Sequence, residues 1–366
     1  MTSKKPLSAE IKEAELSDNE KSALKQFVYP PQRASSNYIQ VAKEMRTNGV
    51  KLGCVLDKHI IPARPGKVTA VLGRPGMGKT SFMASIAVKQ AKEIVEQGLE
   101  DKEYVAFVTW ETPVEELEAF FQDLDGYNVT DLAWGRIPDD ALVSSSLERP
   151  KLPIWSIGNS LTETSITSEP MIVERVYNAI IGIYKEYGLK PRVILCDYIQ
   201  KIPVGRASDK IEKVSRAVAM VRRLSVALST PVFLGCQARQ VVDDRERPIP
   251  TMRDAEWSAT IIQDCDCAIS VWRPIRSFLP DEKPTIEVPA KSGQHYTNND
   301  NLMVVKLLKQ RWESGSGEWA ISMDMSTLEI KDLVHVEISK IADALPEPEE
   351  YGAFSNMIQN SERPTF

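Results

Sequence analysis

An apolar run passes into a glycine-rich turn between residues 68 and 80. The run is Val68–Leu72, and it continues into Gly73-Arg74-Pro75-Gly76-Met77-Gly78-Lys79-Thr80. From Lys79 to Gln97, apolar residues recur at helical spacing, and Gly98 stands where a helix would end. The order of these patterns predicts a buried strand, a tight turn and a helix in direct succession.

The turn is typical of a phosphate-binding loop. A G-x-x-x-x-G-K-[ST] motif is informative when it follows a strand and opens a helix, and both conditions hold here. The glycines let backbone N–H groups face phosphate oxygens, and the start of the helix adds a partial positive charge. We therefore predict ATP and Mg²⁺ as cofactors, with Lys79 at the β- and γ-phosphates and Thr80 on the metal. The predicted nucleotide-binding residues are Gly73, Arg74, Pro75, Gly76, Met77, Gly78, Lys79, Thr80 and Ser81.

Two other apolar runs end in carboxylates. Asp197 follows Val193–Cys196, and Glu111 follows Tyr104–Trp110. Both acids are expected at the strand ends beside the phosphate loop. Asp197 is predicted to hold the metal and its water shell, and Glu111 to act as the general base toward the attacking water. Glu111 could instead be an acid at the start of a helix, because Pro113 and further glutamates follow.

Short apolar runs alternate with helical patterns along the rest of the chain. We predict an α/β fold of the RecA-like P-loop NTPase type, in which helices flank a mostly parallel sheet and the closing strands are antiparallel. The predicted organisation is a flexible arm over residues 1–35, a linker helix over 36–48, a motor domain over 49–340 and a disordered acidic tail over 341–366. The linker helix could belong to the core or dock on a neighbouring subunit.

These residues together resemble the C-terminal motor domain of DnaB-type replicative helicases, over about Gly49 to Met323. The resemblance is carried by the phosphate loop with its Arg-Pro pair, Asp197-Tyr198-Ile199-Gln200, Gln237, the run 252–266 and Lys309-Gln310-Arg311. It implies an ATP-dependent DNA helicase or translocase of DNA replication, which hydrolyses ATP at subunit interfaces and moves along single-stranded DNA.

The resemblance also implies roles for three residues outside the phosphate loop. Gln237 would sense the γ-phosphate, and Lys309 and Arg311 would reach into the ATP site of a neighbouring subunit. An arginine finger of this kind stabilises charge on the transferred phosphoryl group. It would require a homo-oligomer, which the resemblance suggests is a ring of six. The alternative is that Lys309 and Arg311 form the solvent side of an edge strand.

In that family, the loops after the third and fourth core strands face single-stranded DNA. The DNA-binding residues implied here are Lys201, Arg206, Lys210, Arg239, Arg245 and Arg247. Residues 192–253 hold twelve Lys/Arg and six Asp/Glu, a local positive excess of the kind that phosphate binding needs. Asp243, Asp244 and Glu246 interleave with the second loop and count against its contact with DNA.

Departures from the family pattern favour the reduced motor of a phage, plasmid or mobile element. Weakly patterned residues 1–35 stand in place of a helical primase-binding domain, and residues 274–300 have the composition of a polar, proline-rich insertion. A loader or another replication protein would be a further partner. Two alternatives share the fold, a RecA/RadA-type recombinase that forms filaments and a KaiC-like regulatory ATPase that acts on a protein partner.

Composition narrows the class of protein. The net charge is −6, the chain is 42% hydrophobic, and its apolar runs are far shorter than the roughly 18 residues of a membrane span. We predict no membrane partner and a cytoplasmic location, in a bacterium or in the host of a phage or mobile element. The five cysteines lie mostly in strand-like runs and are expected to be reduced thiols.

Overall fold

The computed structural model describes residues 17–47, 49–122, 127, 129–163, 169–205, 207–257, 260–311 and 316–334. The chain divides into two compact units, Met1–Gly49 and Val50–Phe366. The first holds helices α2 (Asp18–Phe27) and α3 (Pro31–Thr47). The sequence predicts a flexible arm as far as residue 35, whereas helix is present from Asp18 onward, broken between α2 and α3. Pro31 begins α3 because the fixed φ of proline suits the first turn of a helix.

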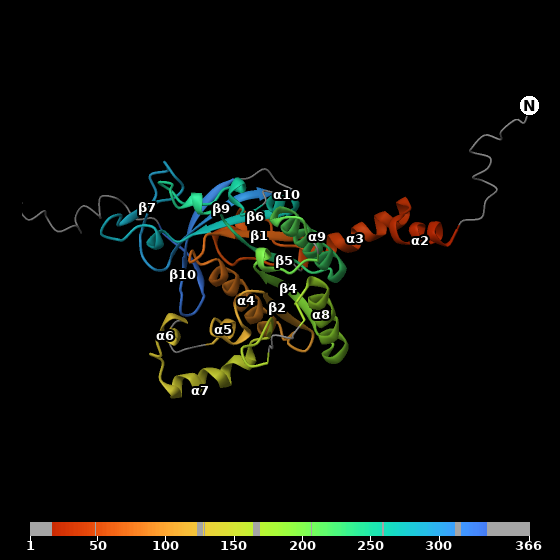
Figure 1. Cartoon of the computed structure of the whole chain (residues 1–366), viewed down its shortest axis with the longest axis horizontal. Helices are drawn as coiled ribbons and strands as arrows, with labels where there is room; N and C mark the ends of the chain where they lie inside the picture. Colours follow the sequence, from red (N-terminus) through yellow and green to blue (C-terminus); the bar gives the residue numbers. More distant parts are fainter. Residues whose placement is uncertain are drawn as a thin grey trace, which may run out of the picture. The chain divides into compact units, whose positions relative to one another are not determined.

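A sheet of nine strands forms the centre of the second unit as far as it is described (Figure 1). Its order is β11-β10-β9-β6-β1-β5-β4-β2-β3. Strands β3, β2, β4, β5, β1 and β6 pair in parallel, and β9, β10 and β11 close the sheet antiparallel. The bounds are β1 Val68–Gly73, β2 Glu103–Thr109, β3 Ile154–Ile157, β4 Lys190–Asp197, β5 Val232–Gln237, β6 Cys267–Trp272, β9 Leu302–Gln310, β10 Gly317–Met323 and β11 Ile330–Asp332. The predicted RecA-like sheet is confirmed.

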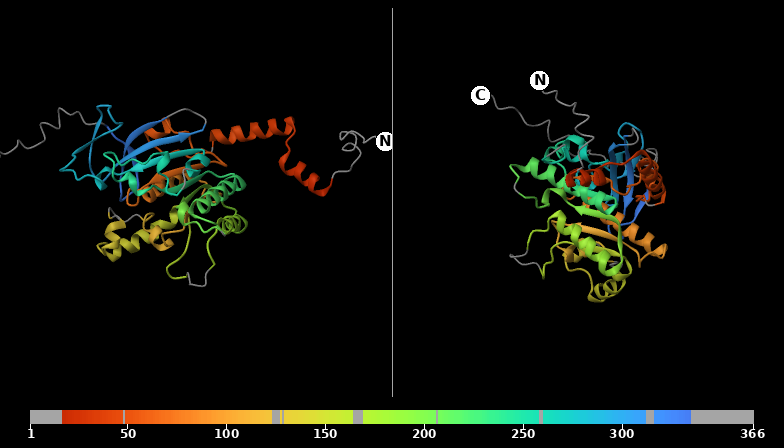
Figure 2. Two further views of the ribbon diagram at one scale, coloured as in Figure 1. Left: turned by 45° about the horizontal axis from the view of Figure 1, so that its top comes forward. Right: turned by 90° about the vertical axis from the view of Figure 1, so that its right-hand side faces the viewer.

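Helices bury both faces of this sheet (Figure 2). Successive side chains of a strand point to opposite faces, so Val71 joins one core cluster while Ala70 and Leu72 join the other. Helix α4 (Lys79–Glu96) covers the first face. The second is covered by α8 (Val173–Tyr187), α9 (Lys210–Leu228) and α10 (Thr260–Asp264).

The segment between β2 and β3 departs most from the sequence pattern. Helix α5 (Val114–Glu118) has only five residues, and α6 (Val129–Ala133) and α7 (Asp139–Glu148) carry little apolar periodicity. Pro138 precedes α7, and two aspartates occupy its first turn. Their negative charges stabilise the helix because its N-terminus carries a partial positive charge. Ser145 and Ser146 of this helix donate to backbone oxygens three residues earlier, those of Leu142 and Val143.

The supposed insertion after β6 is structured. Strands β7 (Thr285–Glu287) and β8 (His295–Thr297) form a hairpin, and Ile286 packs with Trp272 and Val304 in a small third core. Short 3-10 helices occupy Val55–Lys58, Arg149–Lys151, Ile199–Lys201, Gln240–Val242, Met252–Asp254 and Pro274–Arg276. Within the described ranges, no helix combines the length and apolar character needed to cross a membrane. The predicted tail, 341–366, lies outside those ranges.

Candidate nucleotide site

The parallel strands bring the predicted site residues to one edge of the sheet. Gly73 at the end of β1 pairs with Gln237 at the end of β5, and Thr109 at the end of β2 pairs with Asp197 at the end of β4. Glu111 follows two residues after Thr109. The carboxyl edge of such a sheet, with a loop leading into a helix, is where α/β proteins bind nucleotides.

The phosphate loop has the backbone that its glycines predict. Gly76 and Gly78 have φ values of 75° and 81°, a region that residues with a side chain rarely adopt. A Cβ at Gly78 would also lie 2.9 Å from Met303 Cε and 3.0 Å from Arg273 Cδ, so the loop packs closely against the neighbouring strand ends. Helix α4 begins directly after it, at Lys79. The loop therefore offers backbone N–H groups and a helix start to an anion.

Asp197 lies at the centre of the site. Its Oδ2 accepts a 2.6 Å hydrogen bond from Thr80 Oγ1, and Lys79 Nζ lies 3.7 Å from Oδ1. Among the described residues no donor makes a hydrogen bond to the buried Oδ1. A buried carboxylate oxygen with spare acceptor capacity beside a threonine hydroxyl fits Mg²⁺ and its water shell, because Mg²⁺ prefers oxygen ligands and keeps several waters. No described group of three or more His, Cys, Asp or Glu side chains suggests another metal site.

Gly235 makes room for this carboxylate. A Cβ on Gly235 would lie 2.8 Å from Asp197 Oδ1 and 3.1 Å from Met83 Cε. Gly235 sits on β5, beside the end of β4, and the sequence pattern shows it only as one residue of an apolar strand. Its role becomes visible only when the two strands are placed side by side.

Tyr198 links the phosphate loop to the predicted base. Lys79 Nζ lies 4.3 Å from the centre of the Tyr198 ring, and the Tyr198 hydroxyl donates to Glu111 Oε1 at 3.4 Å. Burial raises the pKa of Tyr198, and the nearby Glu111 carboxylate raises it further, so the hydroxyl remains a donor at neutral pH. Glu111 itself is half exposed, and Lys201 Nζ lies 3.8 Å from its Oε1. It is therefore accessible to water and bordered by a cation.

Gln200 fixes the end of β5. Its Nε2 donates to the backbone oxygen of Gln237 at 3.2 Å, and its Oε1 accepts from the Gln237 backbone N–H at 3.2 Å. Gln200 is buried, so both bonds are shielded from water. The last residue of the Asp197–Gln200 motif thus positions Gln237, the predicted γ-phosphate sensor, at the same edge as the phosphate loop.

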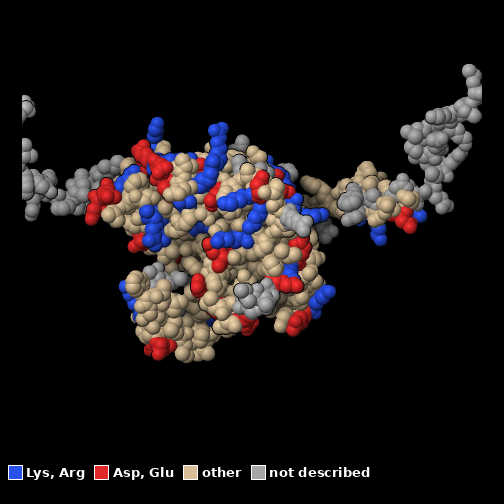
Figure 3. Space-filling view, in the orientation of Figure 1, with Lys and Arg blue, Asp and Glu red and all other residues tan. Residues whose placement is uncertain are grey.

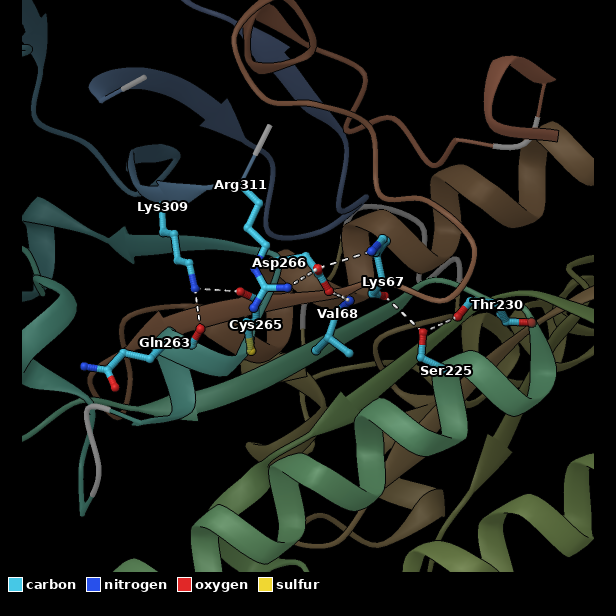
Figure 4. A network of polar contacts seen from close by, with 9 residues as sticks. All are labelled: Lys67, Val68, Ser225, Thr230, Gln263, Cys265, Asp266, Lys309 and Arg311. Carbon is cyan, nitrogen blue, oxygen red and sulfur yellow. Dashed lines mark hydrogen bonds and ion pairs between the residues drawn. The ribbon is translucent and has the colours of Figure 1, made fainter. Parts of the chain in front are cut away.

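Lys309 and Arg311 lie at the opposite edge of the sheet (Figure 4). Arg311 Nη1 lies 3.3 Å from Oδ1 of the buried Asp266, which precedes β6, and the Arg311 backbone N–H donates to the Asp266 carbonyl at 3.1 Å. Asp266 Oδ2 accepts from the backbone N–H of Val68, the first residue of β1. With a rise of about 3.3 Å per residue, β1 separates this edge from Gly73 by roughly 16 Å. Arg311 therefore cannot serve the phosphate loop of its own subunit.

Lys309 is held within its own subunit. Its Nζ donates to the backbone oxygens of Ile262, Gln263 and Cys265, at 2.5 to 3.0 Å, where α10 ends. Lysines near a helix C-terminus commonly bind the last carbonyls in this way. Burial lowers the pKa of Lys309, and the nearby Arg311 lowers it further. The two cations therefore differ in their surroundings. The Lys309 ammonium group is hydrogen-bonded to three carbonyls of its own subunit, whereas the Arg311 side chain is 39% exposed to solvent.

Comparison with known proteins agrees with this geometry. A family model described as the DnaB-like helicase C-terminal domain matches residues 49–312, well over half of the chain. The chain belongs to this DnaB-like family. The match spans the phosphate loop, Asp197, Glu111 and Lys309 to Arg311.

Relatives of known description support the assignment. The chain is 23% identical over 282 residues to the replicative DNA helicase DnaB of Rickettsia bellii, covering 73% of this chain and 54% of that protein. It is 26% identical over 223 residues to a probable plasmid replicative DNA helicase of Chlamydia psittaci, covering 60% and 45%. For DnaB of Helicobacter pylori the values are 24% over 258 residues, covering 68% and 49%. The chain thus spans about half the length of the curated relatives it matches.

Solved structures share the fold. A structure described as an ATPase domain superposes with a TM-score of 0.62 at 15% identity, covering 82% of this chain and 98% of that domain. A DnaB-like replicative helicase studied for its interactions with primase gives a TM-score of 0.61 at 16% identity, covering 84% and 67%. At this identity the likeness concerns the fold alone.

The cations implied to bind DNA divide into two groups in this DnaB-like domain. Lys201 and Lys210 lie on the exposed surface after β4, where Lys210 Nζ sits 4.9 Å from the Trp257 ring centre. Arg239 is exposed after β5, and its guanidinium donates to the Arg253 backbone oxygen. Arg206 lies outside the described residues.

Arg245 and Arg247, by contrast, form ion pairs at 2.7 Å with the little-exposed carboxylates of Asp254 and Glu318. Arg245 donates to both oxygens of the buried Asp254 at 2.7 Å. Burial alone would raise the pKa of Asp254, but its hydrogen bonds with Arg245 and Thr251 lower it to about 2. Arg247 donates to Glu318 Oε2 and to the Glu287 backbone oxygen, both at 2.7 Å. The structure therefore gives these two arginines a structural role, which the charge pattern alone does not reveal.

Proposed function

We propose that this chain is an ATP hydrolase that moves along single-stranded DNA, as the motor part of a DnaB-like helicase. The observation that carries the proposal is the convergence of Lys79, Thr80, Asp197 and Glu111 on one sheet edge, with Arg311 on the other. The first four would supply the phosphate-binding cation, the metal ligands and the general base that phosphoryl transfer to water requires. Arg311 would supply the arginine finger, which the site of a single copy lacks.

The side chains have distinct tasks in this proposal. Bound ATP and Mg²⁺ supply the transferable phosphoryl group and a divalent charge beside it. Lys79 would neutralise phosphate oxygens, and Thr80 and Asp197 would hold the metal. The Glu111 carboxylate would take a proton from the water that attacks the γ-phosphate and displaces ADP. Gln237, whose backbone is held by Gln200, would sense the γ-phosphate. Tyr198 keeps Glu111 aligned through its hydroxyl.

The place of Arg311 supports a homo-oligomer. Because the phosphate loop of the same copy is out of reach, we propose that Arg311 serves the site of a second copy in a ring of six. Apolar side chains available for such contacts include Tyr38 on α3 and Trp134 and Leu147 near α6 and α7, each about 70% exposed. Over α6 and α7 the surface carries little charge, whereas Lys and Arg gather over β6 and β9 (Figure 3). On the face seen in Figure 3, this weakly charged surface suits contact with another subunit.

Single-stranded DNA is proposed to bind Lys201, Lys210 and Arg239. Such contacts grip the phosphate backbone, so binding should be independent of sequence and sensitive to salt. Lys201 Nζ also lies 3.8 Å from Glu111 Oε1, so the proposed DNA-binding cation borders the proposed base. Family membership favours this interpretation over the recombinase and the regulatory ATPase. A loader or another replication protein remains a proposed partner.

The proposal is tested by ATP turnover and by particle images of the same sample. We expect single-stranded DNA to stimulate turnover several-fold, and images with a non-hydrolysable ATP analogue to show closed rings. Turnover that ignores DNA would count against a translocase and favour a regulatory ATPase. Filaments with strong stimulation would favour a recombinase.

A further inference from the structure

The side chain of Arg74, a residue of the phosphate loop, binds the loop after β5. Its Nε lies 3.0 Å from both oxygens of Asp243, and its Nη2 lies 2.8 Å from Asp243 Oδ2. Its Nη1 donates to the backbone oxygen of Ala238 at 2.9 Å. Arg74 is largely buried, at 15% exposed, and a fork of this kind fixes direction as well as distance. A residue of the phosphate loop therefore holds two points of another loop.

The held loop, residues 238–250, is braced internally. Ala238 and Ala255 form an isolated bridge, and the Arg239 backbone N–H donates to the Asp254 carbonyl at 2.8 Å. Arg245 pairs with the same Asp254 through both carboxylate oxygens. These contacts tie Ala238, Arg239 and Arg245 to residues 254–255. A displacement at Ala238 or Asp243 would therefore also displace Arg239.

The ion pair with Arg74 explains why Asp243 is acidic in a loop that also carries arginines. Asp243 and Asp244 interleave with arginines and weaken the case that the loop binds DNA. Asp243, however, is neutralised by Arg74, whereas the side chain of the exposed Asp244 has no hydrogen-bond or ion-pair partner among the described residues. Asp243 therefore has a structural reason to be acidic that Asp244 lacks.

We propose that Arg74 and Asp243 form a tether that couples nucleotide binding at the phosphate loop to DNA binding at loop 238–250. This rests on the proposed function. Arg74 lies between Gly73 and the glycines that must close on phosphate, so a change in that backbone moves the guanidinium and the loop that it holds. Coupling between two ligands is reciprocal, so DNA at Arg239 would in turn favour the nucleotide-bound phosphate loop.

The test measures the affinity for a fluorescent single-stranded oligonucleotide with and without a non-hydrolysable ATP analogue. The ratio of the two dissociation constants is the coupling. We expect Asp243→Asn to reduce this ratio at least fivefold, Arg74→Ala to reduce it similarly, and the double variant to lose little more, since both remove one interaction. Asp244→Asn is the matched control, because it removes the same charge from the next position, and it should keep the wild-type ratio. Asp243→Glu should retain most of the coupling.

A second readout needs no nucleotide. In the ligand-free protein, amide hydrogen exchange over residues 240–247 should be faster in Asp243→Asn than in Asp244→Asn, while exchange over β1 and α4 stays unchanged. Wild-type coupling in Asp243→Asn, or unchanged exchange in that loop, overturns the tether and leaves the proposed function intact. Wild-type protein that binds the oligonucleotide equally with and without the analogue also overturns the tether. Wild-type protein that binds no oligonucleotide overturns the proposed function, and the tether with it.

Discussion

The two edges of the central sheet differ in how well their polar groups are satisfied. At the carboxyl edge, Asp197 Oδ1 is buried and accepts no hydrogen bond from the described residues. At the amino edge, both oxygens of Asp266 have partners, since Oδ1 faces Lys67 and Arg311 and Oδ2 accepts from Val68. One edge therefore has spare capacity for a ligand, whereas the other holds a cation in place.

Under the proposed function, a complete site needs two copies of the chain. The carboxyl edge would supply the phosphate loop, the proposed metal carboxylate and the proposed base, while the amino edge would supply Arg311, which is 39% exposed and out of reach of its own phosphate loop. Because each copy carries both edges, a head-to-tail contact would satisfy one edge with the other, and repeated contacts of that kind close into a ring or extend into a filament.

The largest expected effect comes from mixing two inactive variants. Lys79→Ala should bind nucleotide poorly, and Arg311→Ala should retain nucleotide binding, but each alone should lose at least about a thousandfold in turnover. In a mixed oligomer, a Lys79→Ala copy can still offer Arg311 to the intact phosphate loop of an Arg311→Ala copy. Mixing should therefore restore a measurable part of the ATP turnover, relative to each variant alone.

The control for the mixing experiment is wild-type protein mixed with Lys79→Ala, which shows whether subunits exchange. If they exchange and the two variants still give no turnover together, the arginine does not act in trans. Full turnover by monomeric wild-type protein would lead to the same conclusion.

Glu111→Gln is the next largest expected effect. The substitution removes the proton acceptor but keeps size and the hydrogen bond from Tyr198, so turnover should fall by about two to four orders of magnitude while binding of an ATP analogue is retained. Glu116→Gln is the matched control, since Glu116 is exposed on α5 a short distance along the chain. Normal turnover in Glu111→Gln would assign the base to another group.

Local patterns predicted the carboxyl edge far better than the rest. The strand, turn and helix around Lys79 are adjacent in sequence, and Asp197 and Glu111 could be placed because each ends an apolar run. The contacts of Arg74 with Asp243 and of Lys309 with Gln263 join residues that are far apart in the chain. The spacing of apolar residues in the sequence therefore could not predict these contacts. For the same reason, charge alone could not separate Arg245, which is paired, from the exposed Arg239.

A smaller effect is expected from Gly235→Ala at the carboxyl edge. The added methyl group would lie 2.8 Å from Asp197 Oδ1 and 3.3 Å from the Cys196 backbone oxygen, so the carboxylate must shift. We expect turnover to fall about tenfold, as a misplacement of about 1 Å can cost more than that, with a higher Mg²⁺ concentration needed for half-maximal rate. Gly182→Ala is the control, since a Cβ there meets nothing within 4 Å and alanine suits helix α8 better than glycine. An unchanged Mg²⁺ dependence in Gly235→Ala would mean that Asp197 does not hold the metal.

The smallest effect on turnover is expected from Lys309→Met. This variant also distinguishes the role of Lys309 from that of Arg311 at the amino edge. Because Lys309 Nζ binds three carbonyls where α10 ends, its loss should lower the free energy of unfolding by about 1 to 3 kcal/mol, measured by denaturant titration. Lys331→Met, which removes a lysine that is 65% exposed, should change it by less than about 0.5 kcal/mol. Turnover per folded molecule should fall far less in Lys309→Met than in Arg311→Ala, since only the arginine is available to a second copy. Equal losses of turnover, with unchanged stability in Lys309→Met, would show instead that the lysine leaves its carbonyls and reaches the neighbouring site together with the arginine.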